Sequence, residues 1–173
     1  MSGLPPYLSR FNTAAIRRLL AVPVLAGIGG AVCVGALEFA ATISQRPFWQ
    51  LPFITSIALI MGAPSSEPAQ PRALIGGHLV SALAGYIVLW LLGPAEWAAA
   101  LSVGLAIVLM LRLKVFHPPA AVDAFLVVKQ VLGIDFLFTV ILTGAILLVG
   151  FAFVWHRLSD WILARLHPEK DAK

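Results

Sequence analysis

Apolar residues run along the chain in six blocks, separated by short polar or proline-rich segments. The blocks lie at about 19–42, 51–63, 72–93, 95–113, 119–133 and 136–156. A membrane-spanning helix needs about 20 apolar residues, so four blocks are long enough to cross. The second and fifth are short, and each borders a proline-rich loop. The pattern predicts an all-α polytopic membrane protein with four to six membrane segments, two of them short or broken.

The composition supports this class. Of the 173 residues, 60% are hydrophobic and 12% are charged, whereas soluble domains average about 25% charged residues. These values exclude a soluble globular enzyme, a disordered chain and a disulfide scaffold. Hydrolase and metalloprotease motifs are missing and the four histidines are scattered, so we expect no enzyme, no cofactor and no metal site. The net charge of +4 is expected to act at lipid headgroups, not on nucleic acid.

The whole chain, 1–173, is expected to form one transmembrane domain with interfacial or cytoplasmic tails at 1–18 and 157–173. With six spans, ten of the twelve Lys and Arg residues lie inside; with four spans only seven do. The positive-inside rule therefore favours six spans, with both termini cytoplasmic in a bacterial-type inner (plasma) membrane.

Segments two and three, with their proline loop, resemble segments four and five, which suggests a repeated helical hairpin. Small residues also recur four apart at Gly27, Ala31 and Gly35, and at Gly77, Ser81 and Gly85. This spacing allows helices to approach closely in lipid. Because so small a chain offers few helices to line a pathway, we expect a homo-oligomer packed partly through one of these faces, with membrane lipids as the other partner.

The two proline loops carry the candidate chemistry. Prolines suit the first positions of a helix, which places helix starts at Pro71, with Gln70 as its cap, and at Pro118, with His117 as its cap. Helix N-termini attract anions. The candidate substrate-binding residues are Ser65, Ser66, Gln70, Arg72, His78, His117, Pro118 and Pro119. The alternative is that these are ordinary loops in which proline ends a helix.

Ionisable residues inside membrane segments are functional candidates by default. Glu38 and Asp123 are the proton-coupling candidates. Glu38 lies about one turn from the end of its span, so it can instead reach the interface. Asp123 follows the second loop closely and is expected to orient His117 or to carry a proton. Lys129 is six residues from Asp123 and should not pair with it.

Histidines outside the loops remain open to two interpretations. His78 is either a packed, hydrogen-bonded residue or a ligand, whereas His156 and His167 are interpreted as tail residues without a functional role.

The stretches MGAPSSEPAQPRALIGGHLVSALAG and FHPPAAVDA resemble the two signature regions of the HPP family, integral membrane proteins named for the His-Pro-Pro triplet. The resemblance covers essentially the whole chain. It implies a four-spanning protein, in contrast to the charge count, and a transporter or channel for a small monovalent anion, with nitrite as the first candidate. Relatives usually have glycine soon after HPPA, where this chain has Val122 and Asp123. The alternative function is a non-transporting assembly or sensor module of the membrane.

Overall fold

The computed structural model describes residues 13–45 and 51–166. The described part of the chain contains only helices: α1 (Thr13–Ser44), α2 (Ile54–Gly62), α3 (Pro71–Leu92), α4 (Glu96–Arg112), α5 (Ala121–Lys129) and α6 (Thr143–Leu166). Short 3₁₀ turns at Leu51–Phe53, Glu67–Ala69 and Pro118–Ala120 precede α2, α3 and α5. Each apolar block of the sequence corresponds to one helix, so the all-α prediction is confirmed.

Among the described residues, three helices are long and apolar enough to cross a membrane: Leu20–Ser44 of α1, α3, and the continuous helix Leu137–Arg165. The 17 residues of α4 span about 25 Å at 1.5 Å per residue. With their 3₁₀ turns, α2 and α5 reach only about 18 Å each, well short of the hydrocarbon core of a bilayer. The prediction that the second and fifth segments are short is confirmed.

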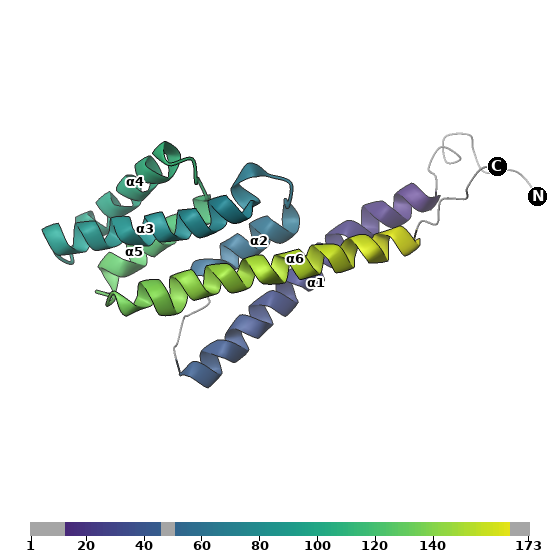
Figure 1. Ribbon diagram of the computed structural model, residues 1–173, viewed down its shortest axis with the longest axis horizontal. Helices are drawn as coiled ribbons and strands as arrows, with labels where there is room; N and C mark the ends of the chain where they lie inside the picture. The colour runs from purple at the N-terminus through teal and green to yellow at the C-terminus, as the bar shows by residue number, and fades with distance from the viewer. Residues whose placement is uncertain (1–12, 46–50, 167–173) are drawn as a thin grey trace, which may run out of the picture.

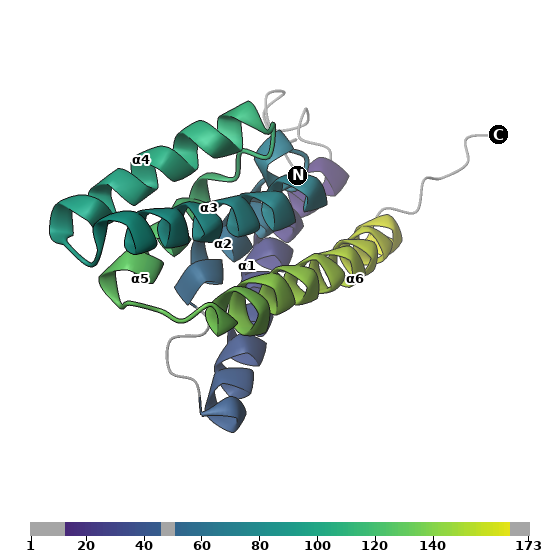
Figure 2. The ribbon, with the colours of Figure 1, turned by 60° about the vertical axis from the view of Figure 1, so that its left-hand side comes forward.

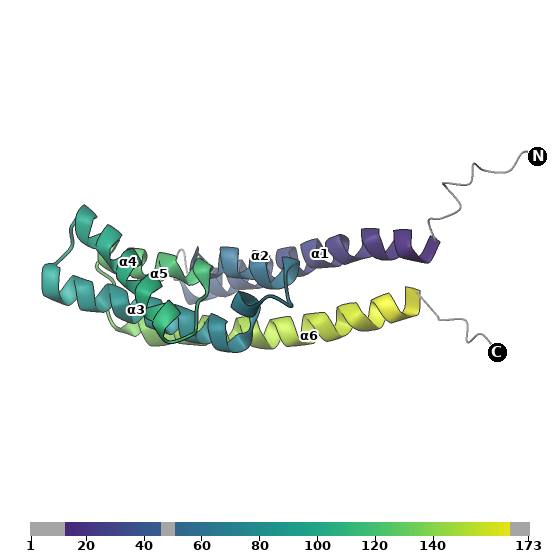
Figure 3. The ribbon, with the colours of Figure 1, turned by 90° about the horizontal axis from the view of Figure 1, so that it is seen from above.

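The helices form two groups (Figures 1 and 2). Helices α3, α4 and α5 pack together at one end of the molecule, while α1 and α6 cross at an angle and extend beyond the others at the opposite end. Seen from above, the start of α1 and the end of α6 lie at this same end (Figure 3). The indole Nε1 of Trp155 in α6 donates a hydrogen bond of 3.2 Å to the carbonyl of Leu25 in α1.

Small residues bring α3 against α5 and the second proline loop. A Cβ on Gly85 would lie 2.9 Å from Cα of Ala124, and one on Gly77 would lie 2.6 Å from Cβ of His117. Gly77 comes before Gly85 along the chain and contacts His117, which comes before Ala124. The two segments therefore run in the same direction. Gly77, Ser81 and Gly85 are buried inside the chain, so their use as an oligomer contact is wrong: α5 already occupies that face.

The face of α1 that carries Gly27, Ala31 and Gly35 is exposed. Apart from the adjacent residues and backbone of α1 itself, no atom of the described residues lies within 4 Å of a Cβ built on Gly27 or Gly35. Long apolar side chains such as Phe39 on α1 and Leu91 on α3 are also exposed, at 67% and 76%. Such an apolar surface is suited to lipid rather than to water.

The helix lengths give no support to a repeated hairpin. In the first pair, α2 and α3, the short helix of 9 residues precedes a helix of 22 residues. In the second pair, α4 and α5, a helix of 17 residues precedes the short helix of 9 residues.

A π-helical turn, Leu137–Leu142, leads into α6. The hydroxyl of Thr143 donates a hydrogen bond of 2.8 Å to the carbonyl of Phe138. The two residues are five positions apart, which is the spacing of a π-helical turn. Gly144 follows directly, and the ring of Phe53 fills the place of its missing side chain. From Thr143 the helix continues without interruption to Leu166, so residues 157–166 of the predicted tail belong to α6.

Candidate functional site

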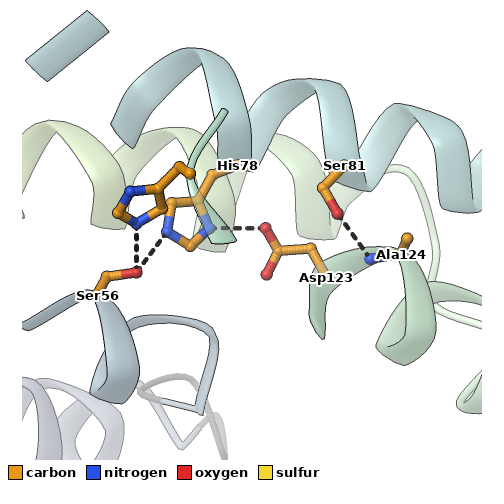
Figure 4. Close-up of polar contacts among 6 residues, drawn as sticks. Ser56, His78, Ser81, Asp123 and Ala124 are labelled. Carbon is orange, nitrogen blue, oxygen red and sulfur yellow. Dashed lines mark hydrogen bonds and ion pairs between the residues drawn. The ribbon is translucent and has the colours of Figure 1, made fainter. Parts of the chain in front are cut away.

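Four polar side chains meet in the interior of the protein (Figure 4). Ser56, His78, His117 and Asp123 are each 0% exposed. They come from four different elements: α2, α3, the second proline loop and α5. Polar groups buried at this depth are hydrogen-bonded in almost all proteins, and these bond mainly to one another.

The contacts form one continuous chain. Oδ2 of Asp123 lies 2.7 Å from Nδ1 of His78, and Nε2 of His78 lies 2.9 Å from Oγ of Ser56. The same Oγ lies 2.8 Å from Nε2 of His117. At the other end, Nδ1 of His117 donates to the carbonyl oxygen of Pro68 at 2.6 Å. We call this set of four side chains the buried network.

The two proline loops therefore touch through His117. Pro118 and Pro119 open the helical segment as predicted, and His117 occupies the capping position, but its ring makes no capping bond. The ring is turned instead towards Pro68 in the first loop.

At the start of α3 the predicted helix boundary is confirmed, with Gln70 at the cap and Pro71 in the first turn. Capping by the Gln70 side chain is wrong, because its amide donates instead to the carbonyls of Pro64 and Ser66 and so closes the first loop.

The remaining candidate residues lie outside the buried network. Ser65 and Arg72 are exposed, and Ser66 donates to the carbonyl of Ala63 at 2.7 Å. Glu38 is exposed on α1. Asp123 pairs with His78, so the expectation that it orients His117 directly is wrong: the helical start brings its carboxyl group against α3 instead.

The charged groups of α5 have different partners. Lys129 forms an ion pair with Glu96 at the start of α4, and both side chains are substantially exposed. The expectation that Lys129 does not pair with Asp123 is confirmed. Oδ1 of Asp123 is buried and has no hydrogen-bond partner among the described residues.

A cavity of about 270 Å³ opens beside the first proline loop. Its wall includes Gln70 and Pro71 at the start of α3, and His156, Arg157 and Asp160 on α6. Nε2 of His156 is buried and has no hydrogen-bond partner within the described ranges. The interpretation of His156 as a tail residue is wrong, because α6 continues as a helix and directs this position towards the first loop.

In the described ranges, no three His, Cys, Asp or Glu side chains are grouped so that they could hold a metal ion.

Residues 16–162 match the family described as HPP, transmembrane region. The chain belongs to the HPP family. Two proteins of Dictyostelium discoideum, each named only as a transmembrane protein, are similar to it: one is 32% identical over 148 residues and the other 37% identical over 124 residues. These alignments cover 80% and 67% of this HPP chain but only 47% and 42% of the relatives, so the chain spans less than half their length. No solved structure matches it.

Sequence reasoning missed Ser56 as a member of the site of this HPP protein. The only signal was a pair of hydroxyl residues, Thr55 and Ser56, in the otherwise apolar stretch ITSIALIM, and such residues often bond to their own helix. The role of Ser56 depends on where two distant histidines lie, which the sequence pattern alone does not show.

Proposed function

We propose that this HPP-family membrane protein is a transporter or channel for small monovalent anions, with nitrite as the first candidate. The observation that carries the proposal is the cavity beside the first proline loop, where the start of α3, the ring of His156 and Arg157 share one wall. The resemblance of the loops to those of nitrite-transporting relatives supports the choice of substrate.

The chemistry of the cavity suits an anion. The first turn of a long helix presents unpaired N–H groups and a partial positive charge. Arg157 adds a permanent charge and a planar fork that fits two oxygen atoms, and Arg72 adds a second charge at the same end of α3. The free Nε2 of His156 provides a hydrogen-bonding group. Asp160 opposes these groups, so it should limit the affinity.

Flux in liposomes tests the proposal. The full chain is reconstituted and the movement of nitrite, nitrate, chloride and formate is compared with that in protein-free liposomes, because nitrous acid crosses bilayers unaided. Arg157→Gln and His156→Gln should each weaken anion binding roughly tenfold, the effect of about 1.4 kcal/mol. Asp160→Asn on the same helix is the matched control and should strengthen binding.

Equal movement of all four anions with and without the protein would contradict the transport proposal. That result would favour a non-transporting assembly or sensor module. The bond between His117 and Pro68 supports this second candidate, because it braces the two proline loops against each other.

We also propose that both ends of the chain face the cytoplasm of a plasma-membrane protein. This is supported by the start of α1 and the end of α6 lying at one end of the molecule (Figure 3). In a Cys33→Ala background, Ala164→Cys should resist labelling by an impermeant thiol reagent added outside, and Gln130→Cys should react. The reverse pattern would contradict this orientation.

A homo-oligomer is the final part of the proposal. The exposed face of Gly27, Ala31 and Gly35 on α1 leaves room for a second helix backbone, and such faces associate in lipid. Gly27→Leu should then convert the oligomer to a monomer by mass in mild detergent. A wild-type monomer in both detergent and lipid would contradict this part.

A further inference from the structure

The buried network holds more protons than its four side chains carry in their ordinary forms at neutral pH. Nδ1 of His117 faces a carbonyl oxygen, which can only accept, so this nitrogen carries a hydrogen. The other three contacts are also hydrogen bonds, and each needs one proton. Four protons are therefore required. Two neutral imidazoles, one hydroxyl and an ionised carboxylate supply only three, so the network contains one additional proton.

Burial and geometry indicate where this proton rests. If Asp123 were ionised, its Oδ1 would be a charged oxygen, buried and without a partner in the described structure, which is far costlier than a neutral carbonyl oxygen in the same place. A neutral Asp123 instead donates from Oδ2 to Nδ1 of His78. His78 then donates from Nε2 to Ser56, and Ser56 donates to Nε2 of His117. Every group in this arrangement is uncharged.

We infer that the buried network is a proton-binding site and relay, with its proton resting on Asp123 and its other end at the first proline loop. Transfer along the network moves three protons by one step each. Oδ2 of Asp123 releases its proton to Nδ1 of His78, Nε2 of His78 releases one to Ser56, and Ser56 releases one to Nε2 of His117. Only O–H and N–H bonds form and break, no electrons are exchanged, and the net charge stays zero.

The product is an ionised Asp123 and a positively charged His117 whose Nδ1 still donates to Pro68. The relay thus carries positive charge from α5 to the loop that borders the anion cavity.

Fixed charges do not interrupt this path. The elements packed around the network are α2, α3, α5 and the two loops, and the titratable groups that they direct into it are His78, His117 and Asp123. Arg112 at the end of α4 is exposed, and so are the other charged side chains of these elements: Glu67, Arg72, Lys114 and Lys129. The ring of Phe53, 4.9 Å from that of His78, covers the network with an apolar surface.

Loss of the additional proton has a structural consequence. Three protons cannot sustain four hydrogen bonds, so at least one contact between the joined elements is lost. If anions move past the first loop, protonation and transport are coupled; this coupling rests on the proposed function, whereas the proton site itself does not.

The test uses the full chain in lipid bilayers, with histidine rings labelled with ¹⁵N for solid-state NMR. His78→Gln and His117→Gln variants assign the signals. We expect a neutral His78 protonated at Nε2 and a neutral His117 protonated at Nδ1. A His78 protonated only at Nδ1, or one that is positively charged, would overturn the inference, because either state requires an ionised Asp123.

Asp123→Asn gives a second criterion. Its amide donates to Nδ1 of His78 as a protonated carboxyl group does, so the His78 signal should stay unchanged; conversion of His78 to another form would overturn the inference. Infrared spectra of the ¹³C-aspartate-labelled wild type give a criterion that needs no variant of Asp123. They should show a protonated carboxyl group that persists in Asp160→Asn, and its absence would also overturn the inference.

Proton movement in liposomes separates the two proposals. With a pH-sensitive dye inside, nitrate flux through the wild type should move protons, and Asp123→Asn should lose this proton movement. Absence of any flux would refute the transport function and leave the NMR result intact, whereas flux without proton movement in the wild type would refute the coupling alone.

Discussion

Ser56→Ala should destabilise this protein more than its small size suggests. The hydroxyl joins the two rings of the buried network by hydrogen bonds, lying 2.9 Å from Nε2 of His78 and 2.8 Å from Nε2 of His117. All three side chains are 0% exposed. Truncation therefore leaves two buried ring nitrogens without a partner and removes almost no apolar contact.

The size of the loss in stability depends on two contributions: the hydrogen bonds that are lost and the buried ring nitrogens that are left without a partner. Single interhelical hydrogen bonds in membrane proteins average about 0.6 kcal/mol, so two lost bonds alone give about 1.2 kcal/mol. A buried group left unsatisfied costs about 1–3 kcal/mol, and here there are two. Some rearrangement of the rings reduces the total, so we expect a loss of about 2–4 kcal/mol in the free energy of unfolding.

This loss can be measured by reversible unfolding in mixed micelles, with steric trapping used to monitor the unfolded fraction. Thr55→Ala is the matched control, because it removes a neighbouring hydroxyl from the same helix at an exposed position and should change stability by less than about 0.5 kcal/mol. Equal stabilities of the two variants would refute the reasoning, since they would show that the bonds to Ser56 do not hold α2 against α3 and the second loop.

The remaining predictions concern packing and isolated contacts, and the same unfolding measurement checks each. Gly77→Ala should lower the free energy of unfolding by about 1–3 kcal/mol, because its Cβ would lie 2.6 Å from Cβ of His117. Gly104→Ala is the control, since its Cβ would meet open space, and it should be neutral or stabilising. Equal effects of the two variants would contradict the close packing of α3. Tyr86→Phe should cost about 0.5–1.5 kcal/mol, since it removes the 2.6 Å bond from the phenol to a backbone carbonyl; an unchanged stability would argue against that bond. Glu96→Gln should change stability by less than about 1 kcal/mol, because its ion pair with Lys129 is exposed, and a larger loss would mean that the pair is shielded in the membrane.

The helices could be predicted from the sequence because hydrophobic blocks and proline positions are local features. Helix α3 starts at Pro71 as predicted, and the 3₁₀ turn that leads into α5 starts at Pro118. Partners could not be predicted in the same way. The pairing of Asp123 with His78 joins residues 45 positions apart, and it depends on α5 lying against the small residues of α3.

The cavity was missed for a related reason. The polar residues after position 156 were interpreted as a tail, since charged side chains at the end of an apolar block usually mark the membrane interface. In the structure the helix keeps its register beyond that point, so the side chain of His156 faces the first proline loop. Whether a helix continues past its apolar block depends on what it packs against, and that is not a local property.

The π-helical turn before α6 has a consequence for how this family can tolerate changes in length. Such a turn contains one residue more than an α-helical turn. Removing a residue between 137 and 142 would restore α-helical register and leave the later part of α6 facing the same neighbours. The same deletion after Gly144 would rotate everything beyond it by about 100° and direct His156 away from the cavity. The two deletions differ by only a few positions in the sequence, yet only the first preserves the relation between α6 and the proline loops.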